Sequence, residues 1–265
     1  MLPRLGPRVE SRVPSVETPR AILFDLDATL IDGAGVTRAT ELVCEHFAAG
    51  HPDLGVDAVQ LANANGAAWK SSAKDFENRW ARGEIDDNEL SAIVWSRTFS
   101  SLGLSTPEVL AAEVARTHVL ALEGAMRPFE DALPALDALA VAGIPLGVVT
   151  NGSSSAQRAK VDILGDERFA FVAVSGEHGI AKPDAGLFEI ALTALDHPAH
   201  GVVHVGDNLI ADIGGARSVG IGSVWINRAG AARPAGTATP DSEITSLLEL
   251  PAALGLPTGS RHDPA

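Results

Sequence analysis

The chain has 265 residues, of which 46% are hydrophobic and 20% charged, a composition typical of a folded protein with one large domain or a main domain carrying a second. Its 34 acidic and 20 basic side chains give a net charge of −14, which argues against a nucleic-acid partner, because that binding needs clustered cations. No stretch approaches the roughly 18 uncharged apolar residues of a membrane helix, and the single cysteine excludes an internal disulfide, so we expect a cytoplasmic protein without a membrane partner.

The first strong signal is an apolar run that turns acidic. Residues 1–19 carry scattered Arg and Pro without an apolar signal segment, and we expect a flexible leader there. The stretch AILFDLDATLID (21–32) begins like a strand buried on both faces of a parallel sheet. Asp25 and Asp27 lie two apart on it and so point to the same side, where they would repel each other without a bound cation.

The next part of the chain has a helical pattern. Between residues 33 and 124, four segments place apolar residues at helical intervals, and Asp86 precedes one of them as a candidate N-cap. We therefore expect an all-helical unit over 33–124, inserted after the first strand. Its tryptophans lie on apolar helical faces and are expected to pack in its interior, although one could line a substrate pocket.

Strands return beyond residue 124, in alternation with helices. We expect strands within IPLGVVTNG (144–152), FAFVAVSG (169–176), GVVHVGD (201–207) and GSVWIN (222–227). This alternation predicts a doubly wound, Rossmann-like α/β parallel sheet. The first strand needs neighbours to cover it, so the predicted core is discontinuous and comprises residues 20–32 and 125–255, followed by a flexible tail at 256–265.

Polar side chains follow the predicted strands, and ligands of open parallel sheets bind at this edge. Besides Asp25 and Asp27 after the first strand, Thr150 and Asn151, followed by Gly152, end the strand within 144–152. Lys182 lies in the loop after the strand within 169–176. Asp207 ends the strand within 201–207, and Asp212 follows five residues later. Carboxylate sites with few protein ligands suit Mg²⁺, which usually shares a phosphate oxygen with its substrate. A lysine, a threonine hydroxyl and backbone N–H groups could bind the remaining phosphate oxygens. We therefore predict a phosphoryl-transfer site with Mg²⁺ as its cofactor.

These motifs also occur in a familiar order. The succession FDLDATL (24–30), VVTNG (148–152), AKPD (181–184) and VGDNLIAD (205–212) resembles the haloacid dehalogenase-like hydrolase superfamily. The resemblance extends over about residues 21 to 227. It implies a hydrolase that acts on a phosphate ester through an aspartyl-phosphate intermediate.

The resemblance assigns a role to each motif residue. It implies that Asp25 is the nucleophile and that Asp27 protonates the leaving alcohol and then deprotonates the hydrolytic water. It implies that Thr150 and Lys182 bind the phosphoryl group. The Mg²⁺ ligands that it implies are Asp25, the backbone carbonyl of Asp27 and Asp207, with Asp212 supporting the metal site directly or through water.

Two further features of the resemblance bear on the substrate. Dehalogenases of the superfamily work without metal and typically have an aromatic residue in place of Asp27, so an acidic residue there favours phosphate esters. Ala28 replaces a Gly that is frequent in the family, a change that we expect to leave the mechanism intact. The helical unit over 33–124 resembles a cap, which implies that its residues select the small phosphorylated metabolite, of the sugar phosphate, phosphoglycolate-like or nucleotide class.

Two alternatives stay open from the residues. A phosphomutase of the same fold shares every core motif, and only strict isomerisation with little phosphate release would distinguish it. A phosphate-receiving signalling module uses similar residues, but its phosphoacceptor lies on a later strand than its acidic pair and it has no helical insertion after the first strand. Two smaller expectations complete the sequence reading. His204, between two valines, is expected to be a packed strand residue. The chain is expected to be a monomer or homodimer.

Overall fold

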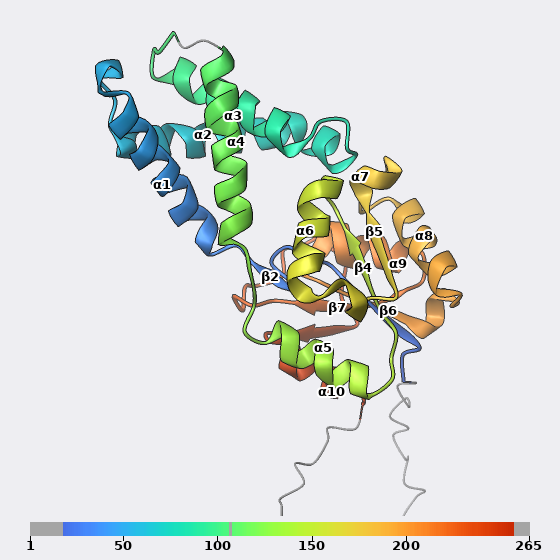
Figure 1. The fold of residues 1–265 in the computed structure, drawn as a ribbon. Helices are drawn as coiled ribbons and strands as arrows, with labels where there is room; N and C mark the ends of the chain where they lie inside the picture. The colour runs from blue at the N-terminus through green and yellow to red at the C-terminus, as the bar shows by residue number, and fades with distance from the viewer. Residues whose placement is uncertain (1–17, 106–107, 257–265) are drawn as a thin grey trace, which may run out of the picture.

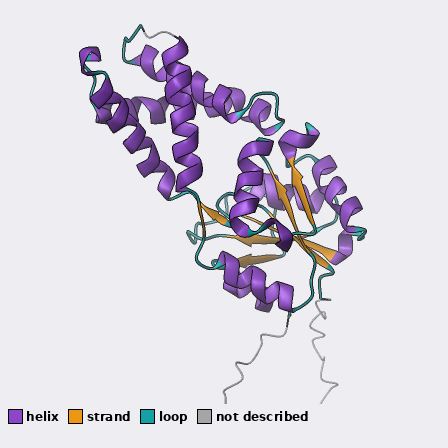
Figure 2. Cartoon of the chain, viewed as in Figure 1, coloured by secondary structure: helices purple, strands orange, loops and turns teal. Residues whose placement is uncertain are grey.

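The computed structural model describes residues 18–105 and 108–256 (Figure 1). The predicted leader over 1–19 and tail over 256–265 lie outside these ranges, apart from residues 18, 19 and 256. The described chain consists of a sheet with helices on both faces and a group of helices beside it, as the colouring by secondary structure shows (Figure 2).

Within the described residues, six strands form one parallel sheet in the order β5-β4-β1-β6-β7-β8. Ile22 of the central strand pairs with Leu146 on one side and Val203 on the other. The prediction that the first apolar run joins a doubly wound sheet is confirmed. The strands are β1 (Ala21–Phe24), β4 (Leu146–Thr150), β5 (Phe171–Val174), β6 (Val202–Gly206), β7 (Gly222–Ile226) and β8 (Ser242–Ile244).

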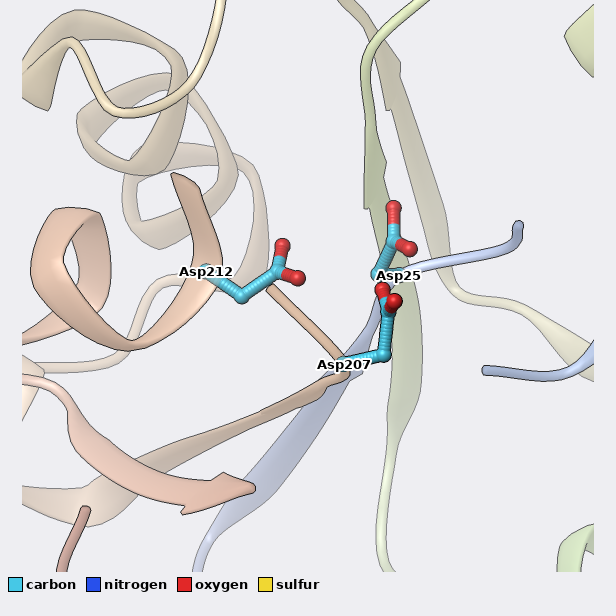
Figure 3. A group of neighbouring side chains, drawn as sticks. All are labelled: Asp25, Asp207 and Asp212. Carbon is cyan, nitrogen blue, oxygen red and sulfur yellow. The ribbon is translucent and has the colours of Figure 1, made fainter. Parts of the chain in front are cut away.

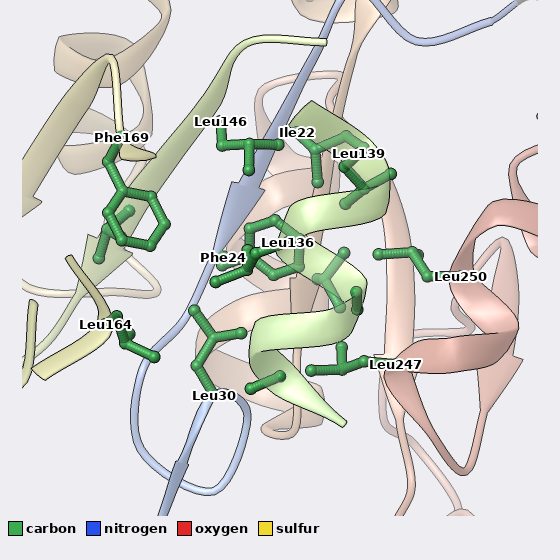
Figure 4. Close-up of a cluster of buried hydrophobic side chains, with 14 of the residues drawn as sticks. Ile22, Phe24, Leu30, Leu136, Leu139, Leu146, Leu164, Phe169, Leu247 and Leu250 are labelled. Atoms are coloured by element: carbon green, nitrogen blue, oxygen red, sulfur yellow. The ribbon is translucent and has the colours of Figure 1, made fainter. Parts of the chain in front are cut away.

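Helices cover both faces of the sheet, because β1 presents apolar side chains to each. On one face, Phe24 packs with Leu136 and Leu247 in the cluster drawn in Figure 4. On the other, Leu23 packs with Phe188. Each such side chain, when fully buried, contributes roughly 1.5–3 kcal/mol. The helices here are α5 (Ala132–Val141), α6 (Ser154–Leu164), α7 (Ser175–His178), α8 (Ala185–Leu195), α9 (Gly215–Ser218) and α10 (Leu250–Ala253).

The chain between β1 and α5 forms a second group of helices, as its periodicity predicted. We call it the helical insertion; its described helices are α1 (Gly35–Gly50), α2 (Ala58–Ala81), α3 (Asp87–Ser101) and α4 (Glu108–Ala125). The side chain of Asp86 caps α3, as expected, and forms a capping box with Glu89. An aromatic cluster of Phe47, Trp95 and Phe99 fills the interior.

Two short strands connect the insertion to the sheet. β2 (Ile31–Asp32) and β3 (Arg127–Pro128) pair antiparallel, so the chain leaves the sheet region and returns to it side by side (Figure 1). A second contact involves Gly83, whose φ is +70° and where a Cβ would lie 2.4 Å from the carbonyl oxygen of Gly176. Only glycine allows this approach. Among the described helices, none is both long and apolar enough to cross a membrane.

Candidate active site

The acidic motif after β1 lies in a tight turn at the carboxyl end of the sheet. The N–H of Asp25 donates to the carbonyl of Val205, which extends the strand pairing by one residue. The chain then turns because the N–H groups of residues 29, 30 and 31 all donate to the carbonyl of Leu26. Ala28 has a φ of 57° in this turn, in the left-handed region that favours glycine. This left-handed conformation explains why glycine is frequent at this position in the family.

Lys182 links two of the predicted acids. Its Nζ lies 2.7 Å from Asp25 Oδ1 and 2.6 Å from Asp212 Oδ1, and donates to the carbonyl of Val149 at 2.8 Å. We call Asp25, Lys182 and Asp212 the lysine–aspartate cluster. Burial alone would lower the pKa of Lys182, but the carboxylates of Asp212 and Asp25 raise it well above its ordinary value. The lysine is therefore a permanent cation beneath the two acids.

Asn151 fixes the position of this lysine through its backbone. The Asn151 side chain accepts a hydrogen bond from the Lys182 N–H at 2.8 Å and donates to the Lys182 carbonyl at 3.0 Å. Asn151, in the motif at the end of β4, thus helps to hold Lys182 in place. Thr150 is the last residue of β4 and is buried beside them.

Asp212 is held from several sides. Its Oδ1 also accepts from His204 Nε2 at 3.1 Å, and its Oδ2 accepts from the Asn208 N–H at 2.9 Å. Burial would raise the pKa of Asp212, but Lys182 and His204 lower it well below its ordinary value. His204 is buried, as expected for a packed strand residue, and it also orients a predicted metal-site acid, which the sequence analysis did not foresee.

Asp25, from the chain after β1, meets Asp207 and Asp212, from the chain after β6 (Figure 3). One carboxylate oxygen of each lies within 4.8 Å of the others. Burial is the main cause that raises the pKa of Asp25 to about 7 and of Asp207 to about 6, and the Asp212 charge adds to both shifts. Clustered carboxylate oxygens of this kind are the donors that a hard divalent cation such as Mg²⁺ prefers, so the residues present fit that metal.

Asp27 has its own partners. Lys160 Nζ lies 2.7 and 2.8 Å from its two carboxylate oxygens, and Gln157 Nε2 donates to it at 3.0 Å. Both partners lie on α6, three residues apart and so on one helix face. Sequence reasoning missed them; the signal was two long polar side chains at this spacing directly after the Thr150 motif.

The backbone N–H of Gly152, a predicted phosphate donor, is bonded to a serine side chain in this structure. The N–H of Gly152 donates to Ser175 Oγ at 2.9 Å, and Ser175 Oγ also contacts the carbonyl of Ala81 in the insertion. A Cβ at Gly152 would lie 2.3 Å from Gln157 Nε2. The loop after β4 therefore joins the site to the insertion through Ser175.

A cavity of about 620 Å³ lies beside the site, between the insertion and the sheet region. Asp27 and Lys160 line it from the sheet region, and residues of α1 to α4 line it from the insertion. This volume lies within the range of about 300–1,000 Å³ found for ligand pockets.

A parallel sheet with carboxylates gathered at its carboxyl edge places the chain among the open α/β proteins, in which ligands bind at a topological switch point. The family model for haloacid dehalogenase-like hydrolases matches residues 19–220. The chain belongs to this family, and its recognition from the four motifs is confirmed.

Individual relatives include phosphatases and dehalogenases. The chain is 31% identical over 212 residues to the 5-amino-6-(5-phospho-D-ribitylamino)uracil phosphatase YigB of Escherichia coli, covering 78% of this chain and 82% of that protein. It is 39% identical over 110 residues to the phosphoserine phosphatase of Thermus thermophilus, covering 41% of this chain and 43% of that one. The chain thus spans about half the length of the first curated relatives it matches. The 2-haloacid dehalogenase of Pseudomonas syringae pv. Tomato DC3000 superimposes with a TM-score of 0.64 at 28% identity, over 89% of this chain and 98% of that one.

Proposed function

We propose that the protein is a Mg²⁺-dependent phosphatase that hydrolyses a small phosphorylated metabolite through an aspartyl-phosphate. The observation that carries this proposal is the pairing of Lys182 with Asp25, while Asp27 lies at the wall of the cavity. The phosphatase relatives support it. The similarity to a 2-haloacid dehalogenase does not oppose it, because the carboxyl group of Asp27 can serve as the proton donor that the leaving alcohol of a phosphate ester needs.

Asp25 and Asp27 would divide the chemistry between them. A carboxylate oxygen of Asp25 attacks phosphorus, the bond from phosphorus to the ester oxygen breaks, and protonated Asp27 gives its proton to that oxygen as the alcohol leaves. Asp27 then takes a proton from water as the water oxygen attacks the phosphorus of the aspartyl-phosphate. The bond between phosphorus and Asp25 breaks, inorganic phosphate leaves, and both residues return to their first state.

The remaining motif residues would bind and orient. Lys182 offsets charge on the phosphoryl group while keeping Asp25 in position, and the Thr150 hydroxyl, the Asn151 N–H and the Gly152 N–H are the further candidates for phosphate oxygens; Gly152 would exchange its bond to Ser175. Mg²⁺, when bound, would offset the negative charge of acids and phosphate. The residues that would hold it are Asp25, Asp207 and the backbone carbonyl of Asp27, with Asp212 directly or through water.

Lys160 and Gln157 are proposed as positioning residues for Asp27. They hold its carboxylate at the cavity wall, and Lys160 is itself only 4% exposed, so its ammonium has little water to replace Asp27 as a partner.

The helical insertion is proposed to act as the cap that selects the substrate. It supplies most of the wall of the cavity that Asp27 lines. The division into a core of residues 20–32 and 125–255 and a cap of residues 33–124, the cytoplasmic location and the monomeric or dimeric state stay predictions. A phosphomutase would differ by passing the phosphoryl group to a second hydroxyl in place of water.

The test is phosphate release from acetyl phosphate and from a generic aryl phosphate. We expect activity that chelation of divalent cations removes and added Mg²⁺ restores, and that Asp25→Asn and Asp27→Asn each abolish. Asp53→Asn, at an exposed position in the short 3₁₀ helix Pro52–Leu54 of the insertion, is the matched control and should keep full activity. Unimpaired hydrolysis by a folded Asp25→Asn variant would rule the proposal out.

A further inference from the structure

The cavity beside Asp27 is large for the smallest metabolites of the predicted classes. Its volume of about 620 Å³ is in the range of pockets that hold drug-sized ligands, and a two- or three-carbon leaving group would leave most of it to water. Leu90, Val94, Val119 and Leu122 give the insertion side a wide apolar surface. A leaving group that filled this space would bind more tightly, because it would remove the apolar surface of the wall from water.

One aromatic side chain in this wall makes neither a ring contact nor a hydrogen bond with the described residues. Of the tryptophans in the insertion, Trp95 donates its Nε1–H to His118 and is fully buried, and Trp80 donates its Nε1–H to Asp87 at 2.8 Å. Trp69, by contrast, is 46% exposed and lines the cavity. Its indole face is therefore available to a ligand.

The charges of the wall favour a leaving group without negative charge. The charged side chains that line the cavity are Asp27, Glu41, Asp87, Glu123, Lys70 and Lys160. Lys160 is already bound to Asp27. A carboxylate or second phosphate on the leaving group would face three further acids with Lys70 as the remaining cation of the lining, and this balance is repulsive.

We propose that this cavity binds a flat, uncharged ring on the leaving alcohol, stacked on the indole of Trp69. The chemical class is the monophosphate of an alcohol that carries a neutral heterocycle or aryl group, of which a nucleoside 5′-monophosphate is one form. This inference rests on the proposed phosphatase function and narrows its substrate class. It sets aside phosphoglycolate-like substrates, whose leaving group carries a carboxylate.

A matched pair of substrates tests the ring directly. Uridine 5′-monophosphate and ribose 5-phosphate share the phosphorylated arm and differ in the base. We expect a kcat/KM at least about tenfold higher for the nucleotide, since one stacked base contributes on the order of 1–3 kcal/mol in other proteins. Phosphoglycolate should be hydrolysed less well than either.

Variants at Trp69 locate the effect. Trp69→Ala should lower kcat/KM for uridine 5′-monophosphate to about that for ribose 5-phosphate, and Trp69→Phe should restore part of the difference. Val59→Ala, on the same helix but 68% exposed and outside the cavity lining, is the control. Equal rates for the matched pair, or an equal loss on all substrates in Trp69→Ala, would overturn the inference.

A binding measurement separates this inference from the proposed function. Calorimetry on the Asp25→Asn variant should show tighter binding of uridine 5′-monophosphate than of ribose 5-phosphate, and Trp69→Ala in that background should remove the difference. Ring-dependent binding without any hydrolysis of acetyl phosphate by the unaltered protein would contradict the phosphatase function and keep the ring site. Hydrolysis of acetyl phosphate without ring-dependent binding would do the reverse.

Discussion

The sheet region and the helical insertion bury polar groups in opposite ways. In the sheet region, the lysine–aspartate cluster confines charges that come from separate segments. In the insertion, the buried network is neutral: Trp95 Nε1–H donates to His118 Nδ1 at 3.1 Å, and His118 Nε2 lies 3.0 Å from Thr40 Oγ1. Because Trp95 can only donate, His118 Nδ1 must be unprotonated. The buried charges thus lie at the carboxyl edge of the sheet, whereas neutral hydrogen bonds hold side chains of the cavity wall in place.

Lys182→Met should disrupt the lysine–aspartate cluster of the sheet region. It leaves Asp25 and Asp212 buried without their cation, and loss of one partner from a buried pair costs about 3–5 kcal/mol. We expect that loss in the free energy of unfolding, measured with urea, together with a drop in acetyl phosphate hydrolysis of at least about a hundredfold.

Lys160→Met is the matched variant for this prediction. Its partner Asp27 has a side chain that is 47% exposed, so water can replace the lysine, whereas the Asp212 side chain is 1% exposed. Lys160→Met should therefore destabilise the protein less than Lys182→Met. Equal unfolding free energies for the two variants would mean that burial of the partner carboxylate does not set the cost.

Acid should destabilise the neutral hydrogen-bond network around His118 in the insertion. Burial lowers the pKa of His118 to about 4, from 6.5. Between pH 4 and pH 6.5, His118 is protonated in the unfolded chain but neutral in the folded chain. Its full contribution to the free energy of unfolding is therefore present above pH 6.5. It declines as the pH falls, by up to about 3 kcal/mol near pH 4.

Urea unfolding of the unaltered protein and of His118→Gln at several values between pH 7 and pH 4.5 measures this term. Glutamine cannot titrate, so the unfolding free energies of the two proteins should converge toward acid. Parallel pH profiles would show that His118 is not kept neutral by its burial.

The smallest effect concerns the backbone of the acidic turn. Ala28→Gly removes the strain of a left-handed φ and adds freedom to the unfolded chain, so we expect a change between zero and about 1 kcal/mol of added stability. Ala140→Gly, in the exposed part of α5, should instead cost about 1 kcal/mol. Thermal unfolding of both variants would compare them, and a loss at Ala28→Gly would contradict this reading of the turn.

The sheet and the gathering of acids at its edge were predictable, because they depend on local patterns. The apolar run before Asp25 and the alternation after residue 124 specify a parallel sheet, and a parallel sheet brings its carboxyl ends to one edge. The capping of α3 by Asp86 followed from the preference of short acidic side chains for helix starts.

The partners of those acids were not predictable in the same way. Lys160 and Gln157 reach Asp27 only because α6 packs against the sheet with that face toward the site. His204 reaches Asp212 because the chain after β6 folds back in a π-helix, Leu209–Gly214. Periodicity assigns such side chains to an element but not to a partner across the fold. The cavity has the same origin, since its wall combines helices whose relative placement no local pattern specifies.

The central position of β1 has a consequence for how the protein is made. Ile22 pairs with Leu146 and Val203, so during synthesis this strand emerges long before both of its neighbours. The helices that follow depend on closer contacts along the chain and can form first, while β1 waits as an unpaired apolar segment. We therefore expect Asp25, the proposed nucleophile, to reach its place late in folding, so the nascent chain needs protection from aggregation until β6 has been synthesised.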